Sequence, residues 1–519
     1  MRIRSFAASL LLIVILAASV SVVSQPTASS LTPGPAAATL KASSILQAVG
    51  LQADVAMLRR AYEALHPGLY RYNTPAQMDA AFRALELEFE RDRTLADAYL
   101  AFSIFAAKVK CGHTYANFYN QKKEVQEALF RAGRVPFYFR WLGTRMIITT
   151  SFASDLHLQS GTEVLAINGT PVATILDRLM TVARADGNND VKRVAYMEVQ
   201  GTDRFEAFDV FFPLLFPSAT PRMTLRVRGP ARNQARQLEV RPLTFEERLS
   251  SMKDADAISG GEEGPFFEFR MLDDRMAYLR MPTWALYNTN WNWKAFLTES
   301  FEALAKRGAT DLVIDLRGNE GGNDVGDEII SHLITHEVQR QAVVRKVRYR
   351  KVPDELVPYL DTWDPSFRDW GLAAIDSTDG FYRLRRDADD DIGGVIKPAF
   401  PTFAGRMWVL VGPTNSSATF EFAQTVRQNR LGTLVGQPTG GNQRGINGGA
   451  FFFLRLPQSG IELDLPLIGQ FPDGNRPDAG LQPDVLVVPT VADIASGRDV
   501  ELDSVRIKAR RPAQIRKRK

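Results

Sequence analysis

Two adjacent serines in the segment VLVGPTNSSATFEF are the side chains of this sequence best placed for covalent chemistry. Ser416 and Ser417 follow an apolar run typical of a buried strand and precede the periodic pattern of a helix. A serine in a strand-to-helix turn can expose its hydroxyl beside helix N–H groups, and the N–H of Ala418 could then bind an oxyanion. Serine, threonine and asparagine are also ordinary helix N-caps, so this segment alone leaves both interpretations open.

A second turn of the same kind is found in LVIDLRGNEGG. Gly318, Gly321 and Gly322 let the backbone approach a ligand closely, and a glycine loop before a helix favours an anion, either phosphate or oxyanion. No Gly-Lys-Ser/Thr follows, which excludes a phosphate-binding P-loop. The alternative is a tight turn without a ligand. Ligands of α/β sheets bind beyond the carboxyl ends of strands, where both turns are expected.

A serine nucleophile needs a base, because its free hydroxyl reacts weakly. The chain has five histidines, and their positions in the sequence do not choose among them: His66, His113, His157, His332 and His336. We expect His332 and His336 on one helix, one turn apart, but no HExxH pattern or third ligand accompanies them, so no metal and no cofactor are predicted. Cys111 is a chemical option as nucleophile with His113 nearby, or else a buried apolar residue.

The ends of the chain indicate export. Arg2 and Arg4 precede an apolar stretch at 6–20, which predicts a signal peptide over 1–24, with an uncleaved membrane anchor as the alternative. A single cysteine excludes an internal disulfide. We therefore expect a periplasmic or secreted protein.

The charge is also unevenly distributed. The 519 residues carry a net charge of +4, but the tail at 506–519 holds eight basic residues and no acid, so the body between signal and tail is near −6. This tail is either a solvated end or a contact for an anionic lipid or cell-wall polymer. No motif points to a nucleic-acid partner.

The length suggests two or three domains, and the residue patterns divide the chain accordingly. The prediction is an α/β protein with a parallel-rich sheet in its last part, because strands and helices alternate there. The expected segments are a flexible leader (25–43), a helical region (44–130), a strand-rich region (135–245) interrupted at 180–220, a linker (245–265) and the alternating region (266–490).

Taken together, the motifs resemble those of the C-terminal processing (tail-specific) serine peptidases. Within that family they are most similar to the branch that includes the tricorn core and interphotoreceptor retinoid-binding protein. The matching segments occur in the family's order and are LHPGLYRY (65–72), CGHT (111–114), GTEVLAINGTPV (161–172), VIDLRGNEGGN (313–323), SATFEFA (417–423), GQPTGG (436–441) and GLQPDV (480–485). They span about residues 55–490, and the glycine loop and the serine turn are specific mainly as a pair.

The resemblance implies a fold and a set of roles. Residues 135–245 would be a PDZ-like domain that grips an extended peptide by strand addition, and 266–490 a catalytic core with the crotonase-like ββα spiral. Ser417 would be the nucleophile. The N–H groups of Gly322 and Ala418 would form the oxyanion hole, with Gly321 adjacent.

One departure from the family pattern bears on the base. The tail-specific branch has a lysine 25 residues after its serine, where this chain has Asn442, and Arg444 cannot act as a base at neutral pH. The tricorn-like branch uses a histidine from the helical region, which His113 in CGHT matches, and an acidic residue for which Asp478 is the best match.

The function implied is an exported serine endopeptidase that cleaves peptides or unfolded protein tails through an acyl-enzyme. A catalytically inactive ligand- or peptide-binding protein of the same fold is the alternative, with the aromatic segments 451–454 and 284–293 lining an apolar pocket. An esterase would differ only in substrate. An acyl-CoA enzyme is disfavoured, because coenzyme A is intracellular and the chain has a predicted signal peptide. The sequence specifies no oligomeric state.

Overall fold

The computed structural model describes residues 40–153, 156, 158–230, 234–251, 266–287, 289–385 and 394–510. The predicted signal peptide, most of the leader, His157, residues 252–265 of the linker and the last nine residues of the basic tail lie outside these ranges. None of the helices within them combines the length and the hydropathy needed to cross a bilayer.

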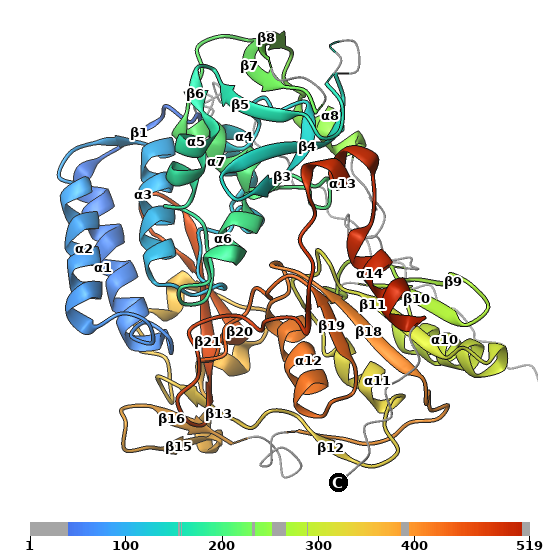
Figure 1. The fold of residues 1–519 in the computed structure, drawn as a ribbon. Coiled ribbons are helices and arrows are strands. Elements are labelled where there is room, and N and C mark those ends of the chain that lie inside the picture. Colours follow the sequence, from blue (N-terminus) through green and yellow to red (C-terminus); the bar gives the residue numbers. More distant parts are fainter. Residues whose placement is uncertain are drawn as a thin grey trace, which may run out of the picture. The chain divides into compact units, whose positions relative to one another are not determined.

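The N-terminal region is helical, as the apolar periodicity predicts (Figure 1). Its elements are β1 (Ile45–Leu46), α1 (Ala48–Leu65), α2 (Pro75–Glu88), β2 (Arg93–Thr94), α3 (Leu95–Lys108) and α4 (Lys123–Leu129). Helix α3 does not extend to Gly112. The helix ends at Lys108, and Lys110 takes the left-handed conformation with φ +58°.

The strand-rich region forms one antiparallel sheet in the order β3-β4-β5-β7-β8, with β6 paired to β5. The strands are β3 (Phe137–Leu142), β4 (Arg145–Ser151), β5 (Glu163–Ile167), β6 (Thr170–Pro171), β7 (Met223–Arg228) and β8 (Ala235–Val240). Asn168 and Gly169 both have positive φ and form the turn between β5 and β6. The helices are α5 (Val172–Leu179), α6 (Asp190–Tyr196), α7 (Ala207–Leu215) and α8 (Phe245–Ser250).

The alternating region builds a mostly parallel sheet in the order β22-β19-β18-β11-β10-β9, and the mixed α/β class is confirmed. Its strands are β9 (Glu268–Met271), β10 (Met276–Arg280), β11 (Asp311–Asp315), β18 (Arg406–Val411), β19 (Thr433–Gly436) and β22 (Val485–Leu486). Its helices are α10 (Trp293–Arg307), α11 (Val325–Ser331) and α12 (Ser417–Gln428). Asp315 at the end of β11 pairs with Leu410 of β18, so the two turns after these strands lie side by side (Figure 1).

Helix α11 is shorter than the sequence suggests, and His332 and His336 do not share a helix. The helix ends at Ser331, because the carbonyls of Ser331 and His332 accept hydrogen bonds from Ala399 and Phe403. The buried ring of His332 stacks on Phe301 at 4.5 Å, and its Nδ1 lies 2.8 Å from the carbonyl oxygen of Pro401. His332 is therefore a core residue.

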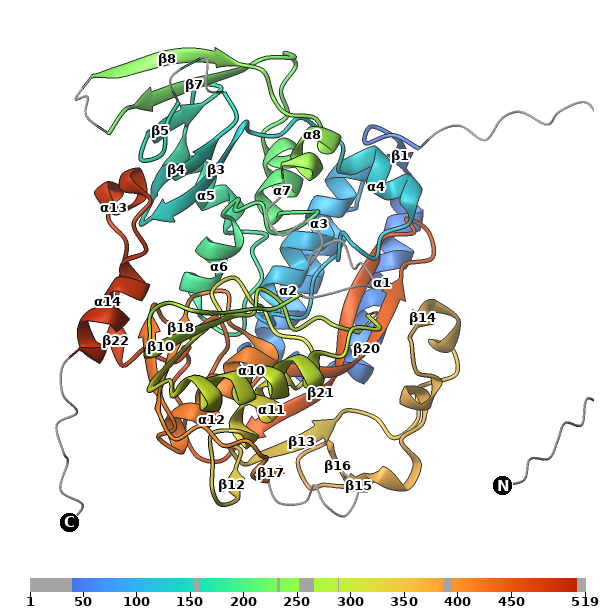
Figure 2. The same ribbon diagram turned by 90° about the vertical axis from the view of Figure 1, so that its right-hand side faces the viewer.

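A second six-stranded sheet has the order β14-β20-β21-β13-β16-β15, with the short β14 beside β20 (Figure 2). Its strands are β13 (Val343–Val347), β14 (Leu360–Asp361), β15 (Ala374–Asp376), β16 (Tyr382–Leu384), β20 (Asn447–Arg455) and β21 (Glu462–Pro472). A separate pair is formed by β12 (Val338–Gln339) and β17 (Val395–Ile396). The long β20–β21 pair shares one hydrophobic core with α1 to α3 and with the strand-rich region. Side chains from all three predicted regions thus contribute to one core.

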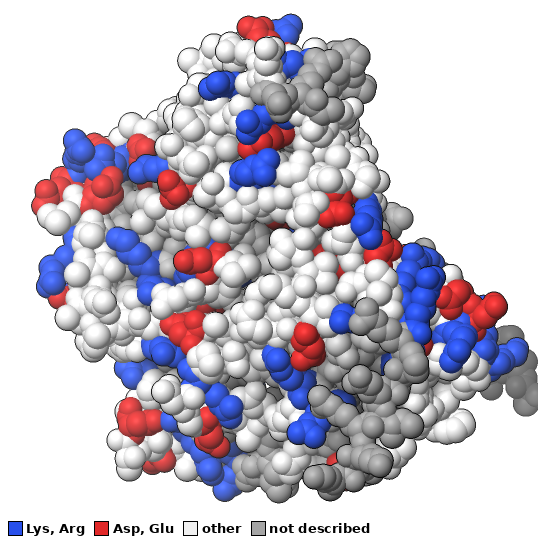
Figure 3. Space-filling model, viewed as in Figure 1, with Lys and Arg blue, Asp and Glu red and all other residues white. Residues whose placement is uncertain are grey.

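The C-terminal helices α13 (Val491–Ser496) and α14 (Val500–Ala509) complete the described chain, and Arg506 and Lys508 of the basic tail lie on α14. On the face drawn in Figure 3, lysine and arginine side chains are interspersed with aspartate and glutamate.

Candidate active site

The backbone of Ser417 has the geometry of a nucleophile turn. Ser417 opens α12 with φ +50°, a conformation that is uncommon for a residue with a side chain. The turn is held by the buried Asn415, whose Nδ2 donates to the carbonyls of Leu316 at 2.6 Å and Asn319 at 2.9 Å. Ser416 occupies the N-cap position without a capping side-chain bond. Its hydroxyl instead donates to the carbonyl of Glu320 at 3.2 Å. The turn is therefore fixed to the glycine loop.

The glycine loop packs directly against this turn. Gly321 has φ +107°, and a Cβ placed on it would lie 2.8 Å from the carbonyl oxygen of Ser416 and 2.9 Å from the nitrogen of Ala418. Gly322, with φ +139°, packs on the backbone of Trp284, where a Cβ would lie 2.2 Å from the carbonyl oxygen. Both positions thus need glycine for conformation and for space.

The N–H groups around Ser417 divide into used and free donors. The N–H of Gly321 donates to Oδ1 of Asn319 at 2.9 Å. Within the described chain, the N–H groups of Gly322 and Ala418 make no intramolecular hydrogen bond. Ala418 lies in the first turn of α12, where helix N–H groups have no partner within the helix. This arrangement leaves Gly322 and Ala418 available as donors, with Gly321 in a supporting position.

His113 lies in the loop after α3 and contacts the start of β20. Its Nδ1 is buried and has no hydrogen-bond partner among the described residues, and its ring is 3.8 Å from the Cβ position of Gly448. Burial lowers the pKa of His113 below its ordinary value, while the negative charge of Asp186 opposes this shift. The imidazole is thus held neutral at pH 7, the state that a general base requires.

Asp186 bonds the loop that carries His113 directly, and Asp478 supports this loop through other residues. The carboxylate of Asp186 accepts the N–H of Gly112 at 3.0 Å. Asn442 is buried, and its Nδ2 donates to the carbonyl of Asp186 at 3.0 Å and to Oδ1 of Asp478 at 2.7 Å. The other partners of Asp478 are Asn188 and Arg444. The structure therefore connects Asp478 to the His113 loop through Asn442 and Asp186.

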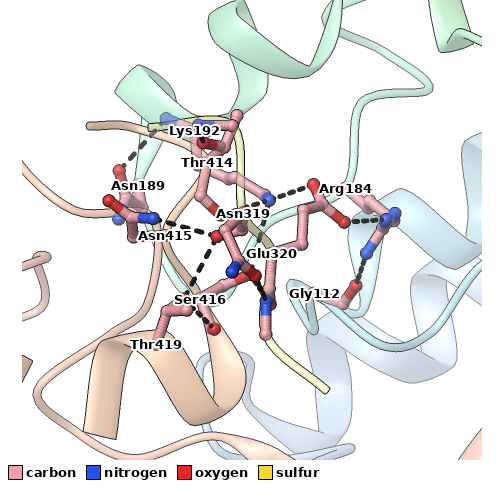
Figure 4. Close-up of polar contacts among 12 residues, drawn as sticks. Gly112, Arg184, Asn189, Lys192, Asn319, Glu320, Thr414, Asn415, Ser416 and Thr419 are labelled. Carbon is pink, nitrogen blue, oxygen red and sulfur yellow. Dashed lines mark hydrogen bonds and ion pairs between the residues drawn. The ribbon is translucent and has the colours of Figure 1, made fainter. Parts of the chain in front are cut away.

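A partly buried ion cluster that the sequence analysis missed connects the serine turn to the His113 loop. Figure 4 shows Glu320 of the glycine loop between Lys192 of α6 and Arg184, with Arg184 also donating to the carbonyl of Gly112. Arg184 lies 2.8 Å from the Glu320 carboxylate. Lys192 is 1% exposed and also reaches the carbonyl of Thr414 at 3.1 Å and Oγ of Ser416 at 3.4 Å. We call Glu320, Lys192 and Arg184 the ion triad.

The charged groups of the ion triad shift one another's pKa. Burial alone would raise the pKa of Glu320, but Lys192 and Arg184 outweigh it and lower this pKa to about 2. Burial lowers the pKa of Lys192, and Glu320 opposes that shift. Glu320 also raises the pKa of His113, whereas Lys192 and Arg184 lower it. The charges of the ion triad thus influence the pKa of the candidate base, His113.

The structure brings His113 and Ser417 to neighbouring elements without a direct hydrogen bond. The hydroxyl of Ser417 makes no hydrogen bond to a described residue, and both side chains are partly exposed. Their chain neighbours Gly112 and Ser416 converge on Arg184 and Glu320. Catalytic hydrogen bonds commonly tighten only when substrate is bound.

Cys111, the other candidate nucleophile, and His66, another candidate base, are both buried. Burial raises the pKa of the Cys111 thiol to about 11, and Nδ2 of Asn447 lies 3.3 Å from its sulfur. Burial lowers the pKa of His66 to about 3, and its ring nitrogens bond Thr114 at 2.8 Å and the N–H of Gly68 at 3.0 Å. A thiolate at Cys111 and a proton on His66 are both disfavoured at neutral pH. Among the described residues, no cluster of three histidine, cysteine or acidic side chains could hold a metal.

Comparisons with known proteins bear on the family and the fold of this chain. Residues 275–487 match the model of peptidase family S41. No curated protein matches the sequence. The solved structure of mature CPAF complexed with lactacystin is 15% identical, covers 89% of this chain and 98% of that chain, and has a TM-score of 0.61. The structure of mature CPAF alone is also 15% identical, with 88% and 96% covered and a TM-score of 0.59.

The structural match extends over nearly the whole described chain and shows that these proteins share a fold. The family match covers both turns, including the glycine loop and Ser417. Residues 275–487 thus form a domain of peptidase family S41, the C-terminal processing (tail-specific) peptidases, and the prediction of a serine-type peptidase is confirmed.

Proposed function

We propose that this protein is an exported endopeptidase that cleaves peptides or unfolded protein tails through an acyl-enzyme on Ser417. The observation that carries this proposal is the left-handed Ser417 at the start of α12, packed against Gly321 and beside the free N–H of Ala418. Such a turn exposes the hydroxyl and places a backbone donor beside it. The alternative of a ligand- or peptide-binding protein without activity is an outcome of the test below.

In the proposed reaction His113 is the general base. His113 takes the proton of the Ser417 hydroxyl while Oγ forms a bond to the scissile carbonyl carbon. The N–H groups of Gly322 and Ala418 donate to the resulting oxyanion. The C–N bond then breaks, and His113 passes its proton to the leaving amine. Water attacks the ester, gives a proton to His113 and releases the acid, and the proton returns to Ser417.

We assign Asp478 a positioning role in this mechanism. Its carboxylate holds Asn442, Asn442 holds the backbone of Asp186, and the carboxylate of Asp186 holds the N–H of Gly112 next to His113. Asp186 is the acidic group that raises the pKa of His113 most, so it would stabilise the imidazolium that forms during catalysis. Asp478 acts on the base only through this chain of contacts.

The experiment is intact-mass labelling with a fluorophosphonate, which modifies activated serines. Wild type is compared with Ser417→Ala, His113→Ala and the matched control Ser416→Ala. We expect one adduct on wild type, none on Ser417→Ala and a rate at least 10³-fold lower on His113→Ala. Ser416→Ala should still label, because the contacts of the Ser416 hydroxyl are with the carbonyl of Glu320 and Nζ of Lys192 and not with Ser417.

The outcomes separate the alternatives. A labelled Ser417→Ala variant would refute the choice of nucleophile, and full labelling of His113→Ala would refute the base. If folded wild type is not labelled, the hypothesis of an inactive binding protein is favoured over that of a peptidase. Export has its own measurement. The mass of the protein recovered outside the cytoplasm should lack residues 1–24, and retention of the full mass would refute cleavage.

A further inference from the structure

A group of aromatic side chains is exposed on one face of β20. Phe452 and Leu454 point into the core, so Phe451 and Phe453 lie on the opposite face and are partly exposed. Trp363, just after β14, is 59% exposed. Its ring centroid is 5.8 Å from that of Phe451 and 5.8 Å from that of Phe453. We call Trp363, Phe451 and Phe453 the aromatic ledge.

The aromatic ledge begins at the candidate base. The ring of Phe451 lies 5.8 Å from the ring of His113. The preceding Gly448 passes under His113, where a Cβ would be 3.8 Å from the imidazole. Gly449 is exposed, and the pairing of β20 with β21 shifts register between Gly448 and Phe451. The ledge is therefore continuous with the site of the proposed reaction.

The far end of the ledge is polar, which limits its length. Arg455, the next residue on the same face, pairs with Asp361 at 3.7 Å and with Glu462 at 2.6 Å. Phe451 and Phe453 are two residues apart on a strand, a spacing of about 7 Å. A surface this short fits one or two side chains of an extended peptide. A bilayer or a second copy of the chain would require a larger apolar area.

We propose that the aromatic ledge is a specificity subsite that receives a bulky apolar side chain of the substrate, within two residues of the scissile bond. This inference rests on the proposed function. Aromatic rings in contact gain from offset or tilted packing in addition to buried area, so a phenylalanine or leucine side chain gains most on this surface. Trp363 is the most exposed residue of the ledge and is therefore the residue to change.

The first test maps the cleavage sites of wild type and Trp363→Ala in denatured casein by mass spectrometry. Wild type should be enriched in phenylalanine, leucine or methionine at one position within two residues of the cut. Two peptides that differ only by phenylalanine or alanine at this position are then compared. Trp363→Ala should reduce kcat/KM about tenfold for the phenylalanine peptide and change it little for the alanine peptide. Leu486→Ala is the matched control, because Leu486 is an exposed apolar residue on β22 of the other sheet.

The second test measures binding and does not need turnover. Ser417→Ala, with and without Trp363→Ala, is titrated with fluorescent casein peptides that differ only by phenylalanine or alanine at the enriched position, or at each position in turn if nothing is cleaved. The preference for phenylalanine should fall about tenfold with Trp363→Ala. An unchanged preference, or an equal loss for both peptides, overturns the subsite. If wild type neither labels nor cleaves but the binding preference for phenylalanine is still observed, the proposed function fails and the subsite stands.

Discussion

The Glu320 carboxylate is the point at which one substitution should alter stability and catalysis together. It pairs with Lys192 and Arg184, and its backbone belongs to the glycine loop that holds Ser417. Glu320→Gln keeps the shape of the side chain but leaves two cations, 1% and 13% exposed, without their shared counter-charge. Lys192 retains only neutral acceptors, the carbonyl of Thr414 and the hydroxyl of Ser416.

The size of the effect follows from burial. Removing one partner of a fully buried ion pair costs about 3–5 kcal/mol, because a charge remains without compensation. The Glu320 side chain is 39% exposed, so water screens part of its interaction and the loss is smaller. We expect Glu320→Gln to lower the free energy of unfolding by about 1–3 kcal/mol at pH 7. Because the pKa of Glu320 is lowered to about 2, this contribution is present above its unfolded pKa and is lost as the pH falls through about 2.

Catalysis should respond through the charge felt by His113. Glu320 raises the pKa of His113 and Lys192 lowers it. Glu320→Gln should therefore move the acidic limb of the kcat/KM profile to lower pH, and Lys192→Met should move it to higher pH. Urea unfolding measures the stability, and a pH profile on one peptide substrate measures the limb.

The opposite signs make this prediction easy to refute. A purely structural effect would lower kcat/KM at every pH without moving the limb. Asp379→Asn is the matched control, because it removes a carboxylate from an ion pair with Lys346 at 2.5 Å, on the sheet of β13 and away from the glycine loop. If Glu320→Gln and Asp379→Asn give the same unfolding free energy and the same pH profile, the reasoning about the ion triad is wrong.

Three further substitutions test single contacts. Gly321→Ala forces a Cβ within 3 Å of Ser416 and Ala418 at a φ of +107°, so labelling of Ser417 should slow by at least about 100-fold, measured by intact mass. Ser416→Ala removes the hydroxyl bond to the carbonyl of Glu320 and the contact with Lys192, and should cost about 1 kcal/mol in urea unfolding. Asp478→Asn should lower kcat about tenfold if Asp478 only positions Asn442, whereas a carboxylate bonded to the base itself would cost about 10⁴-fold.

The parts of the site that lie within one continuous segment could be predicted from the sequence. The apolar runs and glycines around 311–322 and 406–418 indicated two strand-to-turn units, and the structure pairs their strands in parallel. The Asn168–Gly169 turn is likewise a local feature, because the preferences of these two residues determine φ. Pairing of parallel neighbours then brings the two turns together without any side-chain information.

The parts that depend on distant segments could not be predicted in this way. Lys192 and Arg184 are ordinary charged residues in an interrupted region, and only the packing of α6 and of the loop before it against the glycine loop pairs them with Glu320. His332 and His336 had helical spacing, but bonds from Ala399 and Phe403 end the helix at Ser331. One signal was present in the sequence, since a charged residue between Asn319 and Gly321 in a buried loop requires a partner.

The environment of Asn442 explains how this chain can lack the lysine that the tail-specific branch carries at this position. Asn442 is buried and donates to Asp186 and Asp478, so the place of an ammonium is taken by an amide that supports the His113 loop. A buried lysine does reach the serine turn, but it is Lys192 of α6, and it contacts the hydroxyl of Ser416 at 3.4 Å while paired with Glu320. Burial lowers the pKa of Lys192 and the charge of Glu320 opposes this shift, and the ion pair with Glu320 connects Lys192 to the glycine loop. In the proposed mechanism the proton goes instead to His113, whose pKa burial lowers and Asp186 raises.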